Sequence, residues 1–239
     1  MKPTVKIFNN PEAVAHACAE YLMELINAKN THIALSGGST PNLLFKILGQ
    51  DYSFKIKWPN AHLYWGDERC VPPFSSESNF KTVKSSLIDH VAIPAENVHR
   101  IRGENDPIQE TMRYTQRIKT LVPTKNGLPA FDVVMLGLGS DGHTASIFPD
   151  QLELIQSREI CELAVHPDSG QQRVTLTGSV INNATTVMFI VTGESKAEKV
   201  AEILGGRKNS ENYPAAHIKN SNGELIWFLD EAASAKLSK

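Results

Sequence analysis

The feature that constrains this chain most is a short apolar run that leads directly into a loop of small and polar residues. Residues 133–136, Val-Val-Met-Leu, carry no polar side chain, which is typical of a parallel strand covered on both faces. The loop that follows, Gly137-Leu-Gly-Ser-Asp-Gly-His-Thr144, presents Asp141 and His143. Open α/β sheets bind ligands at the carboxyl ends of their strands, where the loops converge. We therefore expect the chemistry of the protein to lie in this loop.

The glycines at positions 137, 139 and 142 have the Gly-x-Gly-x-x-Gly spacing of dinucleotide-binding loops. The match is weak, because such a loop normally opens its domain and is followed by an acidic residue about 20 residues later. Here the loop lies past the middle of the chain, and His143 and Thr144 follow the third glycine at once. A tight turn with positive φ would explain the glycines, but it would not explain Asp141 and His143 beside them.

Strand-like and helix-like segments alternate along the chain. Helices are expected after Asn10-Pro11, after Asp106-Pro107, and over residues 43–48 and 196–204. Strands are expected at residues 5–8, 32–35, 61–65, 133–136, 160–165, 173–177, 187–192 and 225–229. The alternation predicts an α/β fold: one domain spanning residues 1–239, with a mostly parallel twisted sheet and helices on both faces, a Rossmann-like three-layer sandwich.

Composition narrows the class of protein further. No apolar run approaches the roughly 20 residues of a membrane span, and the first residues do not begin a signal peptide, so we expect a cytoplasmic protein without membrane contact. Cys18, Cys70 and Cys161 form no CxxC pair, which favours reduced thiols. The net charge of −2 gives no general attraction to nucleic acid. The histidines form no HxH or HExxH spacing, so no metal is implied.

The segment Ser36-Gly-Gly-Ser-Thr-Pro41 connects a predicted strand to a predicted helix. Backbone N–H groups at a helix N-terminus bind anions, and the hydroxyls of Ser39 and Thr40 add donors. The segment is not a Walker loop, because no Gly-Lys-Ser/Thr follows it. The simpler alternative is that Ser39 or Thr40 only caps the helix, with Pro41 at its first position.

Charged residues mark three other positions. Lys196 closes Thr192-Gly-Glu-Ser-Lys196 in the expected first turn of a helix, where a cation opposes the helix dipole. Such a lysine is usually a solvated surface residue, and the alternative is that it lies opposite a bound phosphate. Arg173 begins an otherwise uncharged strand, either as an edge residue or as an anion ligand. Asp67 and Arg69 follow the strand that ends at Trp65, where a local ion pair is the alternative to a functional role.

Together these motifs resemble the 6-phosphogluconolactonases, within a wider group that includes glucosamine-6-phosphate deaminase. The motifs occur in the order of that family between residues 35 and 197, and each is modest alone. They are Leu35-Ser-Gly-Gly-Ser-Thr-Pro41, Trp65-Gly-Asp-Glu-Arg69 with Val71-Pro72, Ser78-Asn79, the run from Gly137 to Pro149, Arg173-Val-Thr-Leu-Thr177 and Thr192-Gly-Glu-Ser-Lys-Ala197.

The deaminase is the nearest rival within this resemblance. Its counterpart of the central motif resembles Asp-Gly-His followed by Ala-Phe-Asn-Glu-Pro, in which the glutamate assists ring opening of the sugar. This chain has Phe148 before Pro149, and phenylalanine cannot transfer a proton. The deaminase also tends to have an aromatic residue where this chain has Arg69. Both departures favour the lactonase.

The resemblance implies hydrolysis of 6-phospho-D-glucono-1,5-lactone to 6-phosphogluconate in the oxidative pentose phosphate pathway. Neutral His143 would activate the attacking water as general base. Asp141 would orient or polarise that histidine, or contact the sugar. The oxyanion would be stabilised by N–H groups of the central loop or by Arg69, and the role of Asp67 stays open.

The resemblance also implies a substrate-binding set and no cofactor, since ester hydrolysis needs neither redox chemistry nor an electron sink. The 6-phosphate would be held by Ser39, Thr40, Arg173 and Lys196, and the whole set is Gly37, Gly38, Ser39, Thr40, Asn79, Arg173 and Lys196. A sugar-phosphate sensor without catalysis is the alternative outside enzymes, because a fold does not fix a function. The sequence leaves the oligomeric state open.

Overall fold

A parallel sheet of seven strands forms the centre of the computed structural model of this chain, which describes residues 2–220 and 223–237. The strand order is β1-β12-β11-β8-β2-β3-β5, and every neighbouring pair is parallel. In chain order the strands are β1 (Thr4–Phe8), β2 (Thr31–Leu35), β3 (Ala61–Trp65), β5 (Val98–His99), β8 (Val133–Leu136), β11 (Thr186–Val191) and β12 (Glu224–Asp230).

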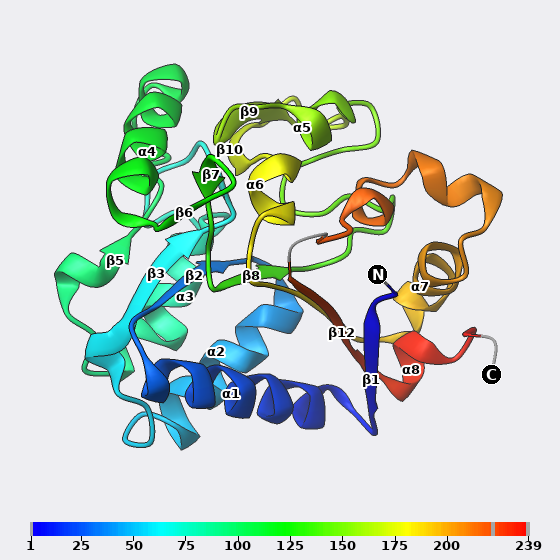
Figure 1. Cartoon of the computed structure of the whole chain (residues 1–239), viewed down its shortest axis with the longest axis horizontal. Helices are drawn as coiled ribbons and strands as arrows, with labels where there is room; N and C mark the ends of the chain where they lie inside the picture. The colour runs from blue at the N-terminus through cyan, green and yellow to red at the C-terminus, as the bar shows by residue number, and fades with distance from the viewer. Residues whose placement is uncertain (1, 221–222, 238–239) are drawn as a thin grey trace.

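Helices cover both faces of this sheet (Figure 1). Two lie on one face, α1 (Pro11–Ala28) and α2 (Ser39–Asp51), and three lie on the other, α4 (Pro107–Leu121), α5 (Glu153–Gln156) and α6 (Gly178–Asn182). The remaining helices are α3 (Asn79–Ser86), α7 (Ala197–Leu204) and α8 (Glu231–Ser234), with short 3-10 turns between elements. The predicted α/β sandwich is confirmed. Among residues 2–220 and 223–237, no helix is long and apolar enough to cross a bilayer.

A second sheet, antiparallel and three-stranded, departs from the regular alternation. Its order is β4 (Asp67–Arg69), β10 (Gln172–Leu176) and β9 (Cys161–Val165). The sequence predicted the last two as strands without separating them from the main sheet. The turn between them is too short for a crossover, so they can pair only antiparallel. The third sheet is the hairpin of β6 (Thr124–Lys125) and β7 (Leu128–Pro129), which turns at Asn126-Gly127, where both residues have positive φ.

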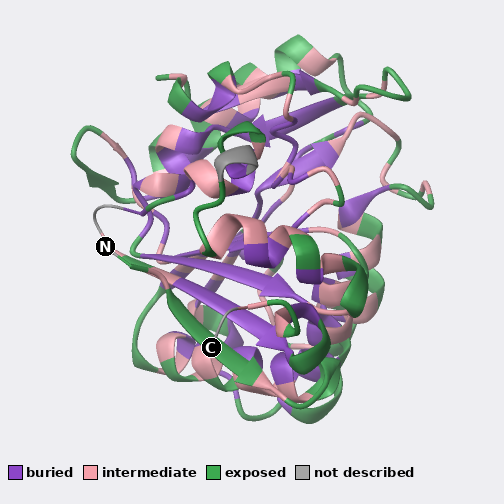
Figure 2. Cartoon of the chain, turned by 90° about the vertical axis from the view of Figure 1, so that its right-hand side faces the viewer, coloured by how far each residue is buried: buried purple, intermediate pink, exposed green. Residues whose placement is uncertain are grey.

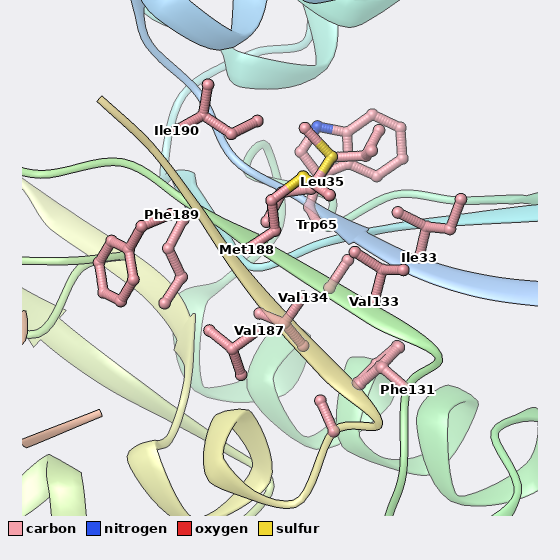
Figure 3. Close-up of a cluster of buried hydrophobic side chains, with 14 of the residues drawn as sticks. Ile33, Leu35, Trp65, Phe131, Val133, Val134, Val187, Met188, Phe189 and Ile190 are labelled. Carbon is pink, nitrogen blue, oxygen red and sulfur yellow. The ribbon is translucent and has the colours of Figure 1, made fainter. Parts of the chain in front are cut away.

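The core is thickest where β8 lies between β2 and β11. All four side chains of β8 are buried, and Val133 is the register partner of both Ile33 and Thr186 (Figure 3). Figure 2 shows the inner strands buried, whereas β1 is an exposed edge strand. The prediction that residues 133–136 form a strand covered on both faces is therefore confirmed.

Side-chain caps mark the starts of three helices, two of which the sequence predicted, after Asn10-Pro11 and after Asp106-Pro107. The side-chain oxygen of Asn10 accepts from the N–H of Ala13 at the start of α1, and Asp106 accepts from Gln109 at the start of α4. Ser78 caps α3, which begins at Asn79. Each of these side chains satisfies an N–H group that has no partner within the helix.

Three histidines stack across neighbouring strands of the main sheet. The rings of His32 and His62 lie 4.8 Å apart, and those of His62 and His99 lie 5.8 Å apart. Burial lowers the pKa of all three rings, and with the nearby Arg117 it brings the pKa of His99 to about 3. All three are therefore neutral in the folded protein at pH 7.

This stack predicts an acid-sensitive stability. A histidine whose pKa is lower in the folded state than in the unfolded state stabilises the fold above the unfolded pKa of about 6.5, and the contribution is lost as pH falls. Each proton taken up on unfolding costs about 1.4 kcal/mol per pH unit. We expect the free energy of unfolding, measured in urea, to fall between pH 6.5 and 4.5, and His99→Gln to fall less steeply. The exposed His90→Gln is the control, and equal slopes for wild type and His99→Gln would contradict the prediction.

Candidate active site

One cavity of about 220 Å³ opens at the carboxyl ends of β2, β8 and β11. The sequence-predicted residues that line it are Gly37, Gly38, Ser39, Thr40, Asp67, Arg69, Asn79, His143, Arg173 and Lys196. The structure thus brings together segments that are far apart in the sequence. Asp141 is the one predicted site residue that does not line the cavity, and it contacts the cavity through His143.

The carboxylate of Asp141 orients the ring of His143 through Nδ1. Its Oδ1 lies 2.6 Å from Nδ1 of the imidazole and also accepts from the backbone N–H of His143 at 3.1 Å. Partial burial alone would raise the pKa of Asp141, but the contacts with His143 outweigh it and lower the pKa to about 2. Asp141 is therefore ionised at neutral pH, and Nδ1 is the nitrogen that donates. Nε2 then has the free lone pair.

The glycines of this loop serve the Asp141–His143 pair. A Cβ atom on Gly139 would lie 2.1 Å from Nδ1 of His143 and 2.6 Å from Oδ1 of Asp141. Gly142 has a φ of +87° and packs against the ring of Tyr213. Two of the three glycines in the spacing that resembles a dinucleotide loop are thus required: Gly142 by its positive φ, and Gly139 by its close approach to the side chains of Asp141 and His143.

The ring of Phe148 packs against the ring of His143. It is fully buried, its ring centroid lies 5.0 Å from that of His143, and the guanidinium of Arg173 lies 5.5 Å from the ring centroid. The ring of His166 packs on it at 5.2 Å. The side chain at this position, behind His143, is therefore an apolar ring that cannot transfer a proton.

Two arginines lie side by side on the second sheet. Arg173 and Arg69 are register partners of β10 and β4, and both line the cavity. Their Nε atoms are buried and have no hydrogen-bond partner within the described residues. Burial and then the neighbouring Arg69 lower the pKa of Arg173. Two guanidiniums with unused donors form a strong receptor for an anion.

Asp67 is buried at the edge of the same cavity. Its carboxylate accepts from the hydroxyl of Ser146 at 2.6 Å, so the strand end and the central loop are joined. Its backbone carbonyl accepts from the amide of Asn79, which packs directly over Gly37. Asp67 therefore fixes the relative positions of three loops. The alternative of a local ion pair between Asp67 and Arg69 finds no support, since no such pair occurs among the described residues.

Glu68, which follows Asp67 in β4, stabilises the start of α3 through hydrogen bonds. Its buried carboxylate accepts from the N–H groups of Arg69, Asn79 and Phe80 and from the hydroxyl of Ser78. Burial raises the pKa of Glu68, and these donors partly offset the rise. The carboxylate thus anchors the start of α3, which places Asn79 in the cavity.

The N-terminus of α2 faces the cavity without a side-chain cap. The helix begins at Ser39, and its N-cap is Gly38 with a φ of +106°, so the alternative that Ser39 or Thr40 caps the helix is wrong. The hydroxyl of Thr40 lies 3.0 Å from that of Thr192, which joins this loop to the one after β11. Free N–H groups at the start of a helix bind anions.

Lys196 lies on the loop after β11, in a 3-10 turn (Glu194–Lys196) that precedes α7. The sequence placed it in the first turn of the helix, and the structure places it at the N-cap. The buried carboxylate of Asp230 accepts from the N–H of Gly193 at 3.0 Å and so fixes this loop. Lys196 lines the cavity and forms no ion pair with any residue in ranges 2–220 and 223–237.

Four supporting residues were missed by the sequence reasoning: Ser146, Thr192, Tyr213 and Asp230. Ser146 lies in the run from Gly137 to Pro149, and Thr192 begins the motif that ends at Ala197. Their hydroxyl groups could have been predicted as hydrogen-bonding groups of the site. Tyr213 and Asp230 gave none, because their contacts with Gly142 and Gly193 join distant parts of the chain. Within the described residues, no group of three histidine, cysteine or acidic side chains is arranged to hold a metal ion.

The sequence model of the family described as Glucosamine-6-phosphate isomerases/6-phosphogluconolactonase matches residues 9–227. The chain therefore belongs to this family of enzymes. It is 48% identical over 203 residues to the 6-phosphogluconolactonase of Haemophilus influenzae, which covers 84% of this chain and 85% of that protein.

Two solved structures have the same fold. A protein described as devB protein aligns with a TM-score of 0.94 and 42% identity, covering 98% of this chain and 99% of that one. The 6-phosphogluconolactonase of Trypanosoma brucei aligns with a TM-score of 0.88 and 28% identity, covering 99% of each chain.

The glycine at position 139 gives a prediction about the Asp141–His143 pair. We expect Gly139→Ala to fold but to displace these two side chains, because its Cβ would overlap them, and to cost about 1–3 kcal/mol in unfolding free energy. Gly137→Ala is the matched control, since its Cβ would meet only Ser36 Oγ at 3.8 Å. The measurement is the NMR signal of the hydrogen-bonded Nδ1 proton of His143. Its survival in Gly139→Ala would contradict the prediction.

Proposed function

We propose that this chain hydrolyses 6-phospho-D-glucono-1,5-lactone to 6-phosphogluconate, in the oxidative pentose phosphate pathway of the cytoplasm. The observation that carries the proposal is His143, which is held by an ionised Asp141, lines a cationic cavity and packs against the buried ring of Phe148. The similarity to the 6-phosphogluconolactonases of Haemophilus influenzae and Trypanosoma brucei supports it. We further propose that residues 1–239 perform this reaction as one domain.

The reaction begins at Nε2 of His143. Because Nδ1 donates to Asp141, Nε2 accepts a proton from a water molecule as that water attacks the C1 carbonyl of the lactone. The bond between C1 and the ring oxygen then breaks, and the imidazolium returns its proton to the departing ring oxygen. The ionised carboxylate of Asp141 stabilises the imidazolium between these two steps. Asp141 thus acts through the histidine.

The tetrahedral intermediate carries a negative charge on the former carbonyl oxygen, and Arg69 is the better candidate to stabilise it. Backbone N–H groups of the central loop were the alternative. Those of Gly139, Gly142 and His143 already donate, to His143 O, Gly139 O and Asp141 Oδ1 respectively. Arg69 lines the cavity and has an unused Nε. A donor aimed at the developing charge typically contributes 10²–10³ in rate.

The 6-phosphate is held, in this proposal, over the start of α2. The N–H groups there have no side-chain cap, the hydroxyls of Ser39 and Thr40 lie beside them, and Lys196 approaches from the loop after β11. Arg173 adds a guanidinium from the second sheet. Fixing this remote group makes the position of the lactone carbonyl reproducible, so that binding energy serves the reacting centre.

The two alternatives to a lactonase, a glucosamine-6-phosphate deaminase and a sugar-phosphate sensor without catalysis, need different groups in the site. A deaminase needs a further proton-transferring group near the histidine, where this site has the ring of Phe148. A sensor that binds a phosphosugar without turnover needs no base oriented by a carboxylate. The Asp141–His143 hydrogen bond therefore favours an enzyme, and the buried Phe148 favours the lactonase.

The experiment that tests the function is hydrolysis of freshly made 6-phosphogluconolactone, corrected for its spontaneous rate in buffer. We expect rapid turnover by the wild type and no ammonia release from glucosamine 6-phosphate. His143→Gln should bind substrate but lose roughly 10²–10⁴ in turnover, the range for one acid–base group.

His166→Gln is the matched control for this variant, because His166 contacts the other side of Phe148 and does not line the cavity. It should keep turnover within a few-fold of wild type. Substantial ammonia release would sink the lactonase assignment. A fully active His143→Gln would show that another group activates the water.

Phosphate capture is tested by comparing phosphorylated with unphosphorylated gluconolactone. A charge-assisted contact contributes about 1.5–3 kcal/mol, so Arg173→Ala and Lys196→Ala should each lower kcat/KM for the phosphorylated lactone roughly tenfold to a hundredfold. The unphosphorylated lactone should change little. Arg173 should matter more, since its planar fork can grip two oxygens. The exposed Lys219→Ala is the control, and a wild-type ratio of the two lactones in both variants would place the phosphate elsewhere.

A further inference from the structure

A second cavity, of about 730 Å³, is lined by residues of α3, β5 and α4. Strand β5 forms the edge of the main sheet opposite β1 (Figure 1). It shares no lining residue with the first cavity. Its size is typical of sites that hold a small organic ligand. Part of its lining is apolar, from Phe80, Ile88 and Val98. Nothing in the proposed hydrolysis uses this cavity.

The rest of the lining is strongly cationic. Glu104 is the one carboxylate among the lining residues. Five lining side chains carry positive charge: Lys84, Arg100, Arg102, Arg113 and Arg117. Three of the cations are neutralised by ion pairs, Arg100 with Glu104, Arg113 with Glu110, and Lys84 with Asp89. Arg102 and Arg117 have no ion-pair partner in the part of the chain that the structure describes. Two positive charges are therefore left over in one cavity.

His99 adds a buried donor to the same lining. Arg117 donates to its Nδ1 through Nε at 3.3 Å and Nη2 at 3.1 Å, so Nδ1 is an acceptor and the proton of the neutral ring is on Nε2. The side chain is only 4% exposed, and Nε2 has no partner among the described residues. Burial and Arg117 lower the pKa of His99 to about 3, which keeps the ring neutral. A buried donor without an acceptor costs free energy.

We propose that this second cavity binds an organic anion that combines a flat apolar ring with two or more negative charges, the chemistry of a nucleoside diphosphate. The ring lies on the apolar surface of Phe80, Ile88 and Val98. The charged end meets Arg102 and Arg117, the two cations without carboxylates. Arg100 already lies 5.0 Å from the ring centroid of Phe80, and its guanidinium offers a second flat surface on which the ligand ring can stack.

The choice of an anion with an apolar body follows from the two halves of the lining. Inorganic phosphate would use the arginines and leave the apolar surface in water, whereas a neutral ring would leave two guanidiniums uncompensated. Only a ligand that carries both parts satisfies both halves. The expected order of affinity is therefore ADP first, with adenosine and inorganic phosphate each much weaker.

The test is isothermal titration of the intact chain with ADP, adenosine and inorganic phosphate, without divalent cations and at two salt concentrations. We expect ADP to bind one site, more weakly at higher salt. Arg102→Ala and Arg117→Ala should each weaken ADP binding roughly tenfold or more. Both arginines are exposed enough to be replaced without loss of the fold, which circular dichroism would check.

Two further variants separate this site from the alternatives. Lys119→Ala removes an exposed cation of α4 that does not line the cavity, and Lys196→Ala removes a cation of the first cavity. Both should keep wild-type affinity for ADP. Absence of ADP binding at millimolar concentration, equal weakening by Lys119→Ala, or weakening by Lys196→Ala in place of Arg117→Ala would each overturn the proposal.

Discussion

The burial of β8 is the constraint on which the rest of the structure depends. Four consecutive apolar side chains lie between β2 and β11 and under helices on both faces, and each contributes roughly 1.5–3 kcal/mol by leaving water. Because β8 is covered on both faces and paired on both sides, the chain leaves it at the carboxyl ends of the parallel strands. The loop that leaves it therefore emerges between the loops after β2 and β11, which is why Asp141 and His143 lie beside two helix starts.

The loop itself is rigid because its own backbone groups are used. The N–H of Gly139 donates to the carbonyl of His143, the hydroxyl of Thr144 donates to the carbonyl of Gly137, and the carbonyl of Gly142 accepts from Ala215. These bonds leave little freedom for the imidazole, whose other contacts are a carboxylate and the ring of Phe148. The orientation of the His143 imidazole is thus set by the fold itself.

Much of the fold and most of the site could be predicted from sequence, because both follow from local patterns. Apolar runs, caps such as Asn10 and Asp106, and polar loops at strand ends are readable within a few residues. The site residues converge because parallel strands end at one edge of a sheet. What could not be predicted depends on pairing across long separations in sequence. The register that sets Arg173 against Arg69, the hydrogen bond from Ser146 to Asp67, and the packing of Tyr213 on Gly142 are of this kind.

The antiparallel sheet places two arginines side by side in the cavity, and nearby groups offset the repulsion between them. Arg69 and Arg173 would repel each other in isolation, yet Arg173 lies over the face of Phe148 and near the buried Asp67, whose charge partly offsets theirs. The carboxylate of Asp67 is directed to Ser146 and forms no ion pair with either arginine among residues 2–220 and 223–237. The guanidinium donors of Arg69 and Arg173 therefore stay available for an anion.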